Sequence, residues 1–166
     1  MFRRAPWIFG GLLVLSGLVG SAREIDQPWI RGVFTGRSPR PVVARETVAW
    51  QHAGALAGKT PGGFVLVGSG RSMQPLYEPG TILVMQACAY TQLQSGQTAL
   101  YRNKAGKVVA HVLIAKARDG WRTAGLNNRI HDMEPVIADN LVGIVIAAFQ
   151  PLPGNHAARI AAISGP

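Results

Sequence analysis

Six short runs rich in β-branched residues occupy the chain from residue 63 onward, and they limit its possible folds more than any other feature. The runs are FVLVG (64–68), TILVMQA (81–87), QTALYRN (97–103), KVVAHVLIAKA (107–117), WRTAG (121–125) and NLVGIVIAAF (140–149). Glycine, asparagine and aspartate separate them, as is typical of turns between strands. Because no long helical pattern lies between the runs, they predict a mainly β fold, an antiparallel barrel or a folded sheet.

Length and composition favour one globular domain. The chain has 166 residues, of which 48% are apolar and only 15% are charged, so it can bury a sizeable core. Cys88 is the only cysteine in the sequence, which excludes an intramolecular disulfide and makes a cysteine-rich metal site implausible. Neither a metal nor another cofactor is predicted.

The first 22 residues, MFRRAPWIFGGLLVLSGLVGSA, have the pattern of an export segment. Arg3 and Arg4 precede 18 residues without charge, and Gly20 and Ala22 supply the small residues of a signal-peptide cleavage site. Two outcomes are open: cleavage after Ala22, which gives a periplasmic or secreted protein, and retention as a hydrophobic anchor helix. In both, the positive-inside rule places the rest of the chain outside the cytoplasm.

Composition divides the rest of the chain into three parts. Residues 23–45 mix proline, glycine and arginine without a sustained period, which indicates an extended linker or a surface-lying arm. The alanine-rich residues 46–58 predict a short helix with an apolar stripe at Val48, Ala53 and Leu56. We therefore expect a linker and short helix over 23–62, a β domain over 63–150 and a C-terminal tail over 151–166.

The chain is strongly basic, with 17 Lys and Arg against 8 Asp and Glu. Such an excess favours contact with phosphate, anionic lipid or acidic proteins. The basic residues are scattered and carry no interleaved aromatic residues, so direct binding of nucleic acid is not expected. A basic surface held against an anionic membrane fits this distribution better.

The stretch VGSGRSMQPLYEPGTILVM (67–85) places Ser72 in a glycine-rich turn between two of the runs. A serine becomes a nucleophile when a base takes its proton, and the carbonyl that it attacks needs nearby backbone N–H donors. Gly68 and Gly70 let the backbone approach a substrate closely, while Pro75 fixes the chain as it leaves the turn. The same composition is typical of an ordinary β-turn, so the turn alone also allows a purely structural role.

The segment SGRSMQPLYEPG resembles the nucleophile box of the type I signal peptidases and of the related self-cleaving repressor domains. That box reads Ser-Gly-x-Ser-Met-x-Pro, followed by a short spacer and Gly-Asp. The resemblance implies that Ser72, which precedes Met73, is the nucleophile. Thr81 stands where the family usually has the aspartate, and that aspartate is commonly structural.

The resemblance also assigns the residues around Ser72 to an oxyanion and substrate loop, formed by Gly70, Arg71, Met73 and Pro75. Gly70 lies two positions before Ser72, where some members carry a serine whose hydroxyl contributes to the oxyanion hole. The backbone N–H of Ser72 is therefore expected to do more of that work.

Members of this family differ in the base that activates the serine. Bacterial enzymes and repressors use a buried lysine, whereas the endoplasmic-reticulum and archaeal branch uses the histidine of a Val-His-Arg-Val string. The run GKVVAHVLIAKARDG is similar to that string, with His111 in the base position 39 residues after Ser72 and Val112 in place of the arginine. The alternatives are a satisfied core histidine, or a lysine base. Lys104, Lys107 and Lys116 are expected to be solvated and therefore unsuited.

The segment TAGLNNRIHDMEP is similar to a third family block, a Gly-Asp-Asn-Asn turn with a second aspartate six residues after the first. Gly125, Asn127 and Asn128 match this turn and are expected to support the site, whereas Leu126 replaces the first aspartate. Asp132 falls on the second. An aspartate beside the imidazole would hold its tautomer and stabilise the imidazolium, although Asp132 also suits an ordinary turn.

These blocks cover residues 64–148, and the resemblance implies two small antiparallel sheets wrapped into a partly open barrel, with the serine loop at the edge of a groove. It implies a serine endopeptidase that cleaves exported pre-proteins after small residues, so that a peptide is the expected partner. The alternative is a peptide-binding or assembly module of weak or no activity, which the replacements at Thr81, Val112 and Leu126 favour.

Overall fold

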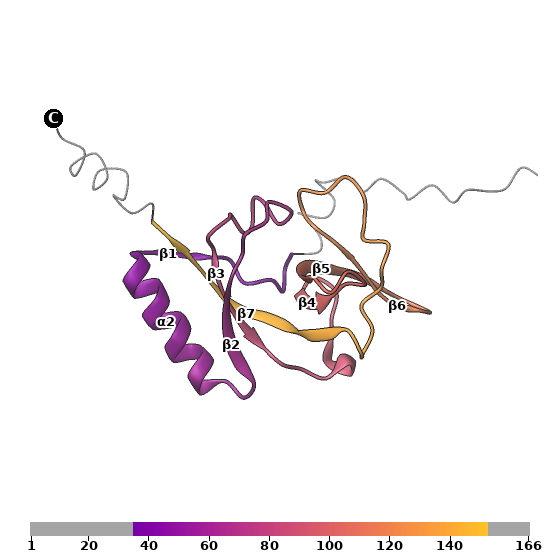
Figure 1. Cartoon of the computed structure of the whole chain (residues 1–166), viewed down its shortest axis with the longest axis horizontal. Coiled ribbons are helices and arrows are strands. Elements are labelled where there is room, and N and C mark those ends of the chain that lie inside the picture. The colour runs from indigo at the N-terminus through magenta and orange to yellow at the C-terminus, as the bar shows by residue number, and fades with distance from the viewer. Residues whose placement is uncertain (1–34, 153–166) are drawn as a thin grey trace, which may run out of the picture.

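The computed structural model describes residues 35–152, which form a mainly β fold of seven strands and one α-helix (Figure 1). The elements in chain order are β1 (Val42–Ala44), α2 (Glu46–Lys59), β2 (Gly63–Val67), β3 (Ile82–Gln86), the 3-10 turn η1 (Tyr90–Gln92), β4 (Thr98–Arg102), β5 (Val108–Ala117), β6 (Gly120–Ala124) and β7 (Leu141–Pro151). The predicted leader (1–22), the start of the linker and most of the predicted tail lie outside the described residues. Among the helices of residues 35–152, none has the length and hydropathy of a bilayer-spanning segment.

The six strands predicted from the β-branched runs are all present, and their ends differ from the prediction by at most two residues. β1 was not predicted. It contains three residues, lies in the segment whose composition indicated an arm, and pairs in parallel with the end of β7. Val42 and Val43 are both exposed on it, so its local sequence carries no alternation between buried and exposed positions that would mark a strand.

The strands form one sheet in the order β2-β3-β7-β4-β5-β6, with β1 also paired to β7. All the pairs except β1–β7 are antiparallel. β7 runs through the middle of the fold and pairs with β3 along one part of its length and with β4 along another. We call β1, α2, β2 and β3 the helix-side half and β4, β5 and β6 the β4–β6 half. β7 joins the two halves.

The sheet changes register on both sides of β7, at Val84/Met85 of β3 and at Leu100/Tyr101 of β4. Gly143 lies on this part of β7, and a Cβ atom there would stand 2.3 Å from the carbonyl oxygen of Gln86. Only glycine therefore allows β3 and β7 to approach so closely at this point. Irregularities of this kind bend a sheet, and they let β7 serve both halves.

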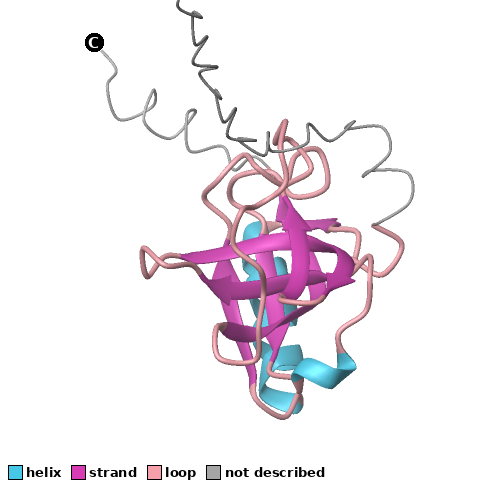
Figure 2. Cartoon of the chain, turned by 90° about the vertical axis from the view of Figure 1, so that its right-hand side faces the viewer, coloured by secondary structure: helices cyan, strands magenta, loops and turns pink. Residues whose placement is uncertain are grey.

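The helix α2 covers the sheet on the helix-side half and lies behind the strands in Figure 2. Its buried residues are Ala49, Ala53 and Ala57, which follow a spacing of four. The predicted stripe was therefore wrong in part, because Val48 and Leu56 are only half-buried. The small alanine side chains let the helix lie close to the sheet, and the larger residues lie at the edges of the contact.

Two further hydrophobic clusters fill the fold beyond the helix. The central cluster includes Met73 and Tyr77 from the Ser72 turn, packed with Leu83, Leu100 and Leu126. The third cluster lies within the β4–β6 half and its buried members are Leu93, Ala99, Tyr101, Leu113, Trp121 and Val136. The turn that carries Ser72 is thus fixed to the central cluster by the side chains of Met73 and Tyr77.

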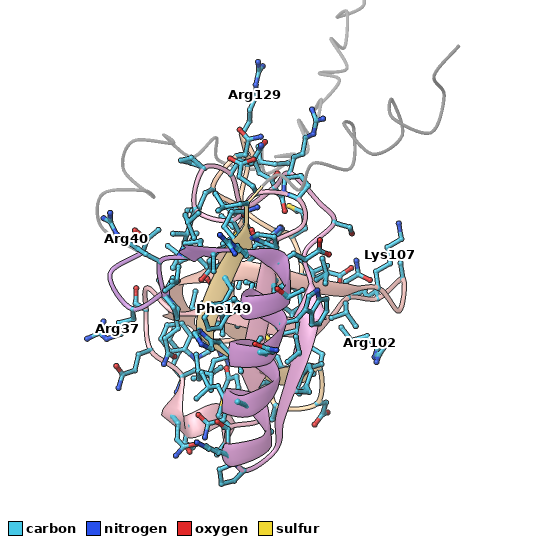
Figure 3. All side chains as sticks on the ribbon, turned by 90° about the vertical axis from the view of Figure 1, so that its left-hand side faces the viewer. Arg37, Arg40, Arg102, Lys107, Arg129 and Phe149 are labelled. Carbon is cyan, nitrogen blue, oxygen red and sulfur yellow. The ribbon has the colours of Figure 1, made fainter. Side chains whose placement is uncertain are left out.

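Basic side chains are distributed around the described part of the chain. Figure 3 shows Arg37 and Arg40 on the left of the molecule, Arg102 and Lys107 on the right, and Arg129 at the top. This arrangement agrees with the scattered distribution in the sequence and gives no single basic stripe among the labelled residues.

Candidate active site

Ser72 lies in the turn between β2 and β3, and both ends of this turn are fixed. The backbone of Gly68 bonds with that of Thr81 and Gly80, which closes the base of the loop. Beyond Ser72, the buried side chains of Met73 and Tyr77 anchor the turn in the central core. Ser72 itself is partly exposed. The turn therefore presents Ser72 at the surface while the residues on both sides of it are fixed.

Ser72, His111 and Asp132 form a continuous hydrogen-bonded chain. The Oγ of Ser72 lies 2.9 Å from Nε2 of His111, and Nδ1 of His111 lies 2.7 Å from Oδ2 of Asp132. An ionised carboxylate only accepts hydrogen bonds, so Nδ1 carries the proton and Nε2 presents its lone pair to the serine hydroxyl. The three predicted residues, 60 positions apart at the extremes, are therefore brought together in the order that proton abstraction from serine requires.

His111 comes from the middle of β5, where it faces Ala99 on β4. His111 is buried, with 6% of its surface exposed, and its neighbour Val112 points to the other face and is fully buried. The histidine is thus embedded in a strand, and both its ring nitrogens are satisfied by the chain that ends at Ser72 and Asp132.

Asp132 lies in the long connection between β6 and β7. Its backbone N–H donates to the carbonyl of Thr123, and Thr123 Oγ1 donates to its Oδ2 at 2.7 Å. Burial alone would raise the pKa of this carboxyl group, but the hydrogen bond and the charge of His111, with the hydroxyls of Thr123 and Tyr101, hold the pKa below its usual value. The aspartate is therefore kept ionised beside the imidazole.

The predicted supporting turn contacts Ser72 directly. The backbone N–H of Asn127 donates to the carbonyl oxygen of Ser72 at 2.7 Å, and Asn128 N–H closes the turn on Gly125. A Cβ atom at Gly125 would stand 2.8 Å from the Ser72 carbonyl oxygen and 2.9 Å from its Cβ. Glycine is required at this position because the two backbones lie against each other.

The remaining predicted loop residues have different surroundings. Gly70 faces the serine, since a Cβ there would stand 3.9 Å from Ser72 Oγ. Arg71 and Pro75 are exposed, whereas Met73 is buried. Within residues 35–152, no hydrogen bond from the backbone N–H of Ser72 or Met73 is present. Two donors are thus available at the nucleophile itself.

The three replacements in the family pattern all lie in packed positions. Val112 and Leu126 are in the core, and Thr81 is fully buried. Thr81 Oγ1 bonds to the carbonyl of Glu78 and to the side chain of Gln150, both at 2.6 Å. These residues support the fold around the site without touching the Ser72–His111 contact.

The three lysines that were alternative candidates for the base are not buried, as a lysine base would need to be. Lys104, Lys107 and Lys116 are all exposed, and Lys116 Nζ lies 5.7 Å from the centre of the Tyr90 ring. Among the described residues, no group of three or more His, Cys, Asp or Glu side chains is arranged to hold a metal ion.

A groove of about 760 Å³ opens beside Ser72 and His111. Its walls are mainly apolar and come from both halves of the fold, with Phe64, Leu66 and Leu83 on one side and Leu100, Val108 and Val142 on the other. Glu78 and Arg102 add charged side chains to the lining. A second hollow, of about 780 Å³, lies at Pro75 and Leu76 and does not include Ser72 or His111.

Two residues that the sequence does not single out belong to the site. Tyr101 OH donates to Asp132 Oδ2 at 3.0 Å, and Thr123 donates to the same oxygen. The antiparallel pairing of β4 with β5 brings Tyr101 near His111, because Ala99, two residues before Tyr101, faces His111. The position of Thr123 depends on the pairing of β5 with β6. The register of this pair shifts between Leu113 and Ala115, so it cannot be deduced by counting residues along the sequence.

No protein-family model matches the chain, and no match is found among curated proteins.

Proposed function

We propose that the protein is a serine endopeptidase of the type I signal peptidase kind, in which Ser72 is the nucleophile and His111 the base. The observation that carries the proposal is the chain from Ser72 Oγ through His111 to Asp132, with contacts of 2.9 and 2.7 Å. A hydroxyl, an imidazole and a carboxylate in this order are the arrangement that makes serine nucleophilic. A core histidine with no chemical role would not need a half-exposed serine on its free nitrogen.

The reaction follows from the direction of the hydrogen bonds. His111 Nε2 takes the proton of Ser72 as Oγ attacks the peptide carbonyl, and Asp132 stabilises the imidazolium that forms. The same nitrogen then gives its proton to the departing amine, which leaves an acyl-enzyme. Water, deprotonated by His111, releases the carboxylic acid and restores Ser72.

The oxyanion that forms in each step needs donors at the nucleophile. The N–H groups of Ser72 and Met73 are suited to this role, because they make no bond within the described chain. Asn127 fixes the carbonyl of Ser72, which orients the peptide unit that follows it. Gly70 leaves the approach to Ser72 Oγ open.

The groove suits an extended peptide. β2 pairs only with β3, and β5 pairs with β6 only from Val112 onward, so two strand edges in the described fold are open beside the groove. A peptide placed between Phe64–Val67 and Val108–Ala110 would form backbone hydrogen bonds and reach Ser72 with its carbonyl. Small residues before the cut, as in signal peptidases, are the proposed specificity.

The finer architecture and the location belong to the same proposal. The two halves of the sheet correspond to the two small sheets of a partly open barrel, and the groove lies between them. The leader at residues 1–22 would bring this domain outside the cytoplasm, either anchored in the membrane or released, and the basic surface would favour anionic lipid.

The test is a comparison of protein N-termini by mass spectrometry in cells that make the wild type, Ser72→Ala or His111→Ala. We expect new N-termini after small residues in the wild type and their loss in both variants. Ser95→Ala and His52→Ala are the matched controls, since both residues lie outside the groove and the hydrogen-bonded chain. They should give the wild-type pattern.

Two results would change the proposal. Identical N-termini in all strains, with folded and abundant protein, would favour a peptide-binding or assembly module on the same fold. Loss of cleavage in Ser72→Ala but not in His111→Ala would keep the nucleophile and require another base.

A further inference from the structure

One oxygen of Asp132 accepts three hydrogen bonds from three different strands. Oδ2 lies 2.7 Å from His111 Nδ1 on β5, 3.0 Å from Tyr101 OH on β4 and 2.7 Å from Thr123 Oγ1 on β6. The proposed peptidase mechanism needs only the first of these bonds. The other two are made by buried side chains, which are 2% and 0% exposed.

The strand register explains why these groups meet. His111 faces Ala99 on β4, and Tyr101, two residues further along, lies on the same side of the sheet. On the other edge, Thr123 faces Leu113, which is two residues from His111 and shares its face. Thus β4, β5 and β6 each contribute one polar side chain to a single face, and Asp132 closes over all three.

Thr123 contacts Asp132 twice. Its carbonyl accepts the N–H of Asp132 at 2.8 Å while its hydroxyl donates to the carboxylate, so the backbone and the side chain of Asp132 are both fixed by one residue. Tyr101 can act only as a donor to the carboxylate, because burial raises the pKa of its hydroxyl. These bonds keep the carboxylate from rotating away from His111. Tyr101 keeps its proton, so it does not neutralise the carboxylate by transferring the proton to it.

We infer that Tyr101 and Thr123 are positioning residues, which hold Oδ2 of Asp132 against His111 Nδ1 and keep the carboxylate ionised. The inference rests on the proposed function for its chemical meaning, but the contacts exist independently of any substrate. Each hydroxyl that donates to a carboxylate stabilises the charged form, so removal of either should raise the proton affinity of Asp132.

The charged and titratable groups around this carboxylate are few in the described structure. His111 faces it from β5 and Tyr101 from β4, and β6 contributes only the neutral Thr123. In the same connection as Asp132, Glu134 acts on Tyr101 through its charge, and His131 Nδ1 contacts the Asp132 carbonyl. Neither replaces the two hydroxyls.

The experiment measures Asp132 directly, by carbon-13 NMR of its side-chain carboxyl in the full chain over a range of pH. We expect the Asp132 pKa to rise in Tyr101→Phe and in Thr123→Val, and to return towards the wild-type value in Thr123→Ser. Peptide cleavage should fall by about tenfold in Thr123→Val, as expected for one lost hydrogen bond to a charged group, and recover in Thr123→Ser.

Matched controls are present in the same molecule. Tyr77→Phe and Thr98→Val remove buried hydroxyls that bond to Pro39 and Ser38 instead, so the Asp132 titration should not move. An unchanged or lowered Asp132 pKa in Tyr101→Phe and Thr123→Val, in folded protein, would overturn the inference. So would a Thr123→Ser protein that behaves like Thr123→Val. If the titrations shift as expected but no variant or wild type cleaves peptides, the peptidase proposal fails and the positioning role stands.

Discussion

The two halves of the sheet differ in what they bury. On the helix-side half the buried cluster contains only Ala49, Ala53, Ala57, Ile82, Val84 and Phe149. In the β4–β6 half, by contrast, His111, Tyr101 and Thr123 are buried within the strands. The buried cluster of the helix-side half is therefore apolar, whereas the β4–β6 half has, beside its own hydrophobic cluster, a buried polar network that includes His111.

This difference teaches where the chain can tolerate change. An apolar cluster is stabilised by area removed from water, which depends on volume and shape. A buried polar network depends on every donor finding its acceptor, so the loss of one member affects the others. We therefore expect substitutions in the helix-side half to act on stability, and substitutions in the β4–β6 half to act on the reaction.

The largest effect is expected at Asp132. Asp132→Asn keeps the size of the side chain but removes the charge that stabilises the imidazolium and presents an amide that favours the wrong tautomer of His111. Hydrolysis should fall by about 10³- to 10⁴-fold, as in serine triads generally. Rate measurements under single-turnover conditions would check this, and a fall of less than tenfold in folded protein would mean that Asp132 is only a turn residue.

The converse is expected at Ile82 on the helix-side half. It is buried next to α2, so Ile82→Ala should lower the free energy of unfolding by about 2–5 kcal/mol through lost burial and a cavity. Urea unfolding measures this change. Below the unfolding transition kcat should stay near the wild-type value, and a parallel loss of kcat would show that the halves are not separate in function.

Gly125 tests the contact between the halves. Gly125→Ala would place a methyl group within 3 Å of Ser72, so we expect a loss of about 1–3 kcal/mol in stability. The displaced Ser72 should lower hydrolysis by up to about 100-fold. The matched control is Gly54→Ala in α2, where nothing lies within 4 Å of the added atom and stability should rise by about 0.5–1 kcal/mol.

The smallest expected effect is the change in the free energy of unfolding when the pH is lowered. Because the pKa of Asp132 is lowered in the folded protein, its contribution to stability is complete above the pKa of the unfolded chain and is lost as the pH falls through the folded value. The difference in unfolding free energy between the wild type and Asp132→Asn should therefore narrow on acidification from about pH 6 to pH 3. A difference that widened would contradict the lowered pKa.

Most of the fold could be predicted because its signals are local. The β-branched runs and the turns between them determine the six longer strands, and the alanine-rich segment determines α2. The buried side of α2 was less accessible, because Ala49 and Ala57 carry little hydrophobic signal and are selected by close packing. β1 depends on its pairing with β7, more than 100 residues away, and leaves no local pattern.

Only part of the site has local signals of this kind, so only that part could be predicted. Ser72, His111 and Asp132 each lie in a short recognisable motif, and the structure brings the three together. Tyr101 and Thr123 lie in ordinary strand sequences, and their role depends on the register of three strands and on the connection that carries Asp132. Such relations arise from tertiary structure and cannot be deduced from spacing along the chain.

The central position of β7 has a consequence for the making of the protein. A ribosome delivers the polypeptide from its N-terminus, so the growing chain contains Ser72, His111 and Asp132 before Leu141–Pro151 has been synthesised. During that interval β3 and β4 lack the strand that lies between them, and closing such distant pairings is slow. The nascent chain thus contains Ser72 on one half and His111 on the other before it contains β7, the strand that pairs with both β3 and β4 and joins the two halves.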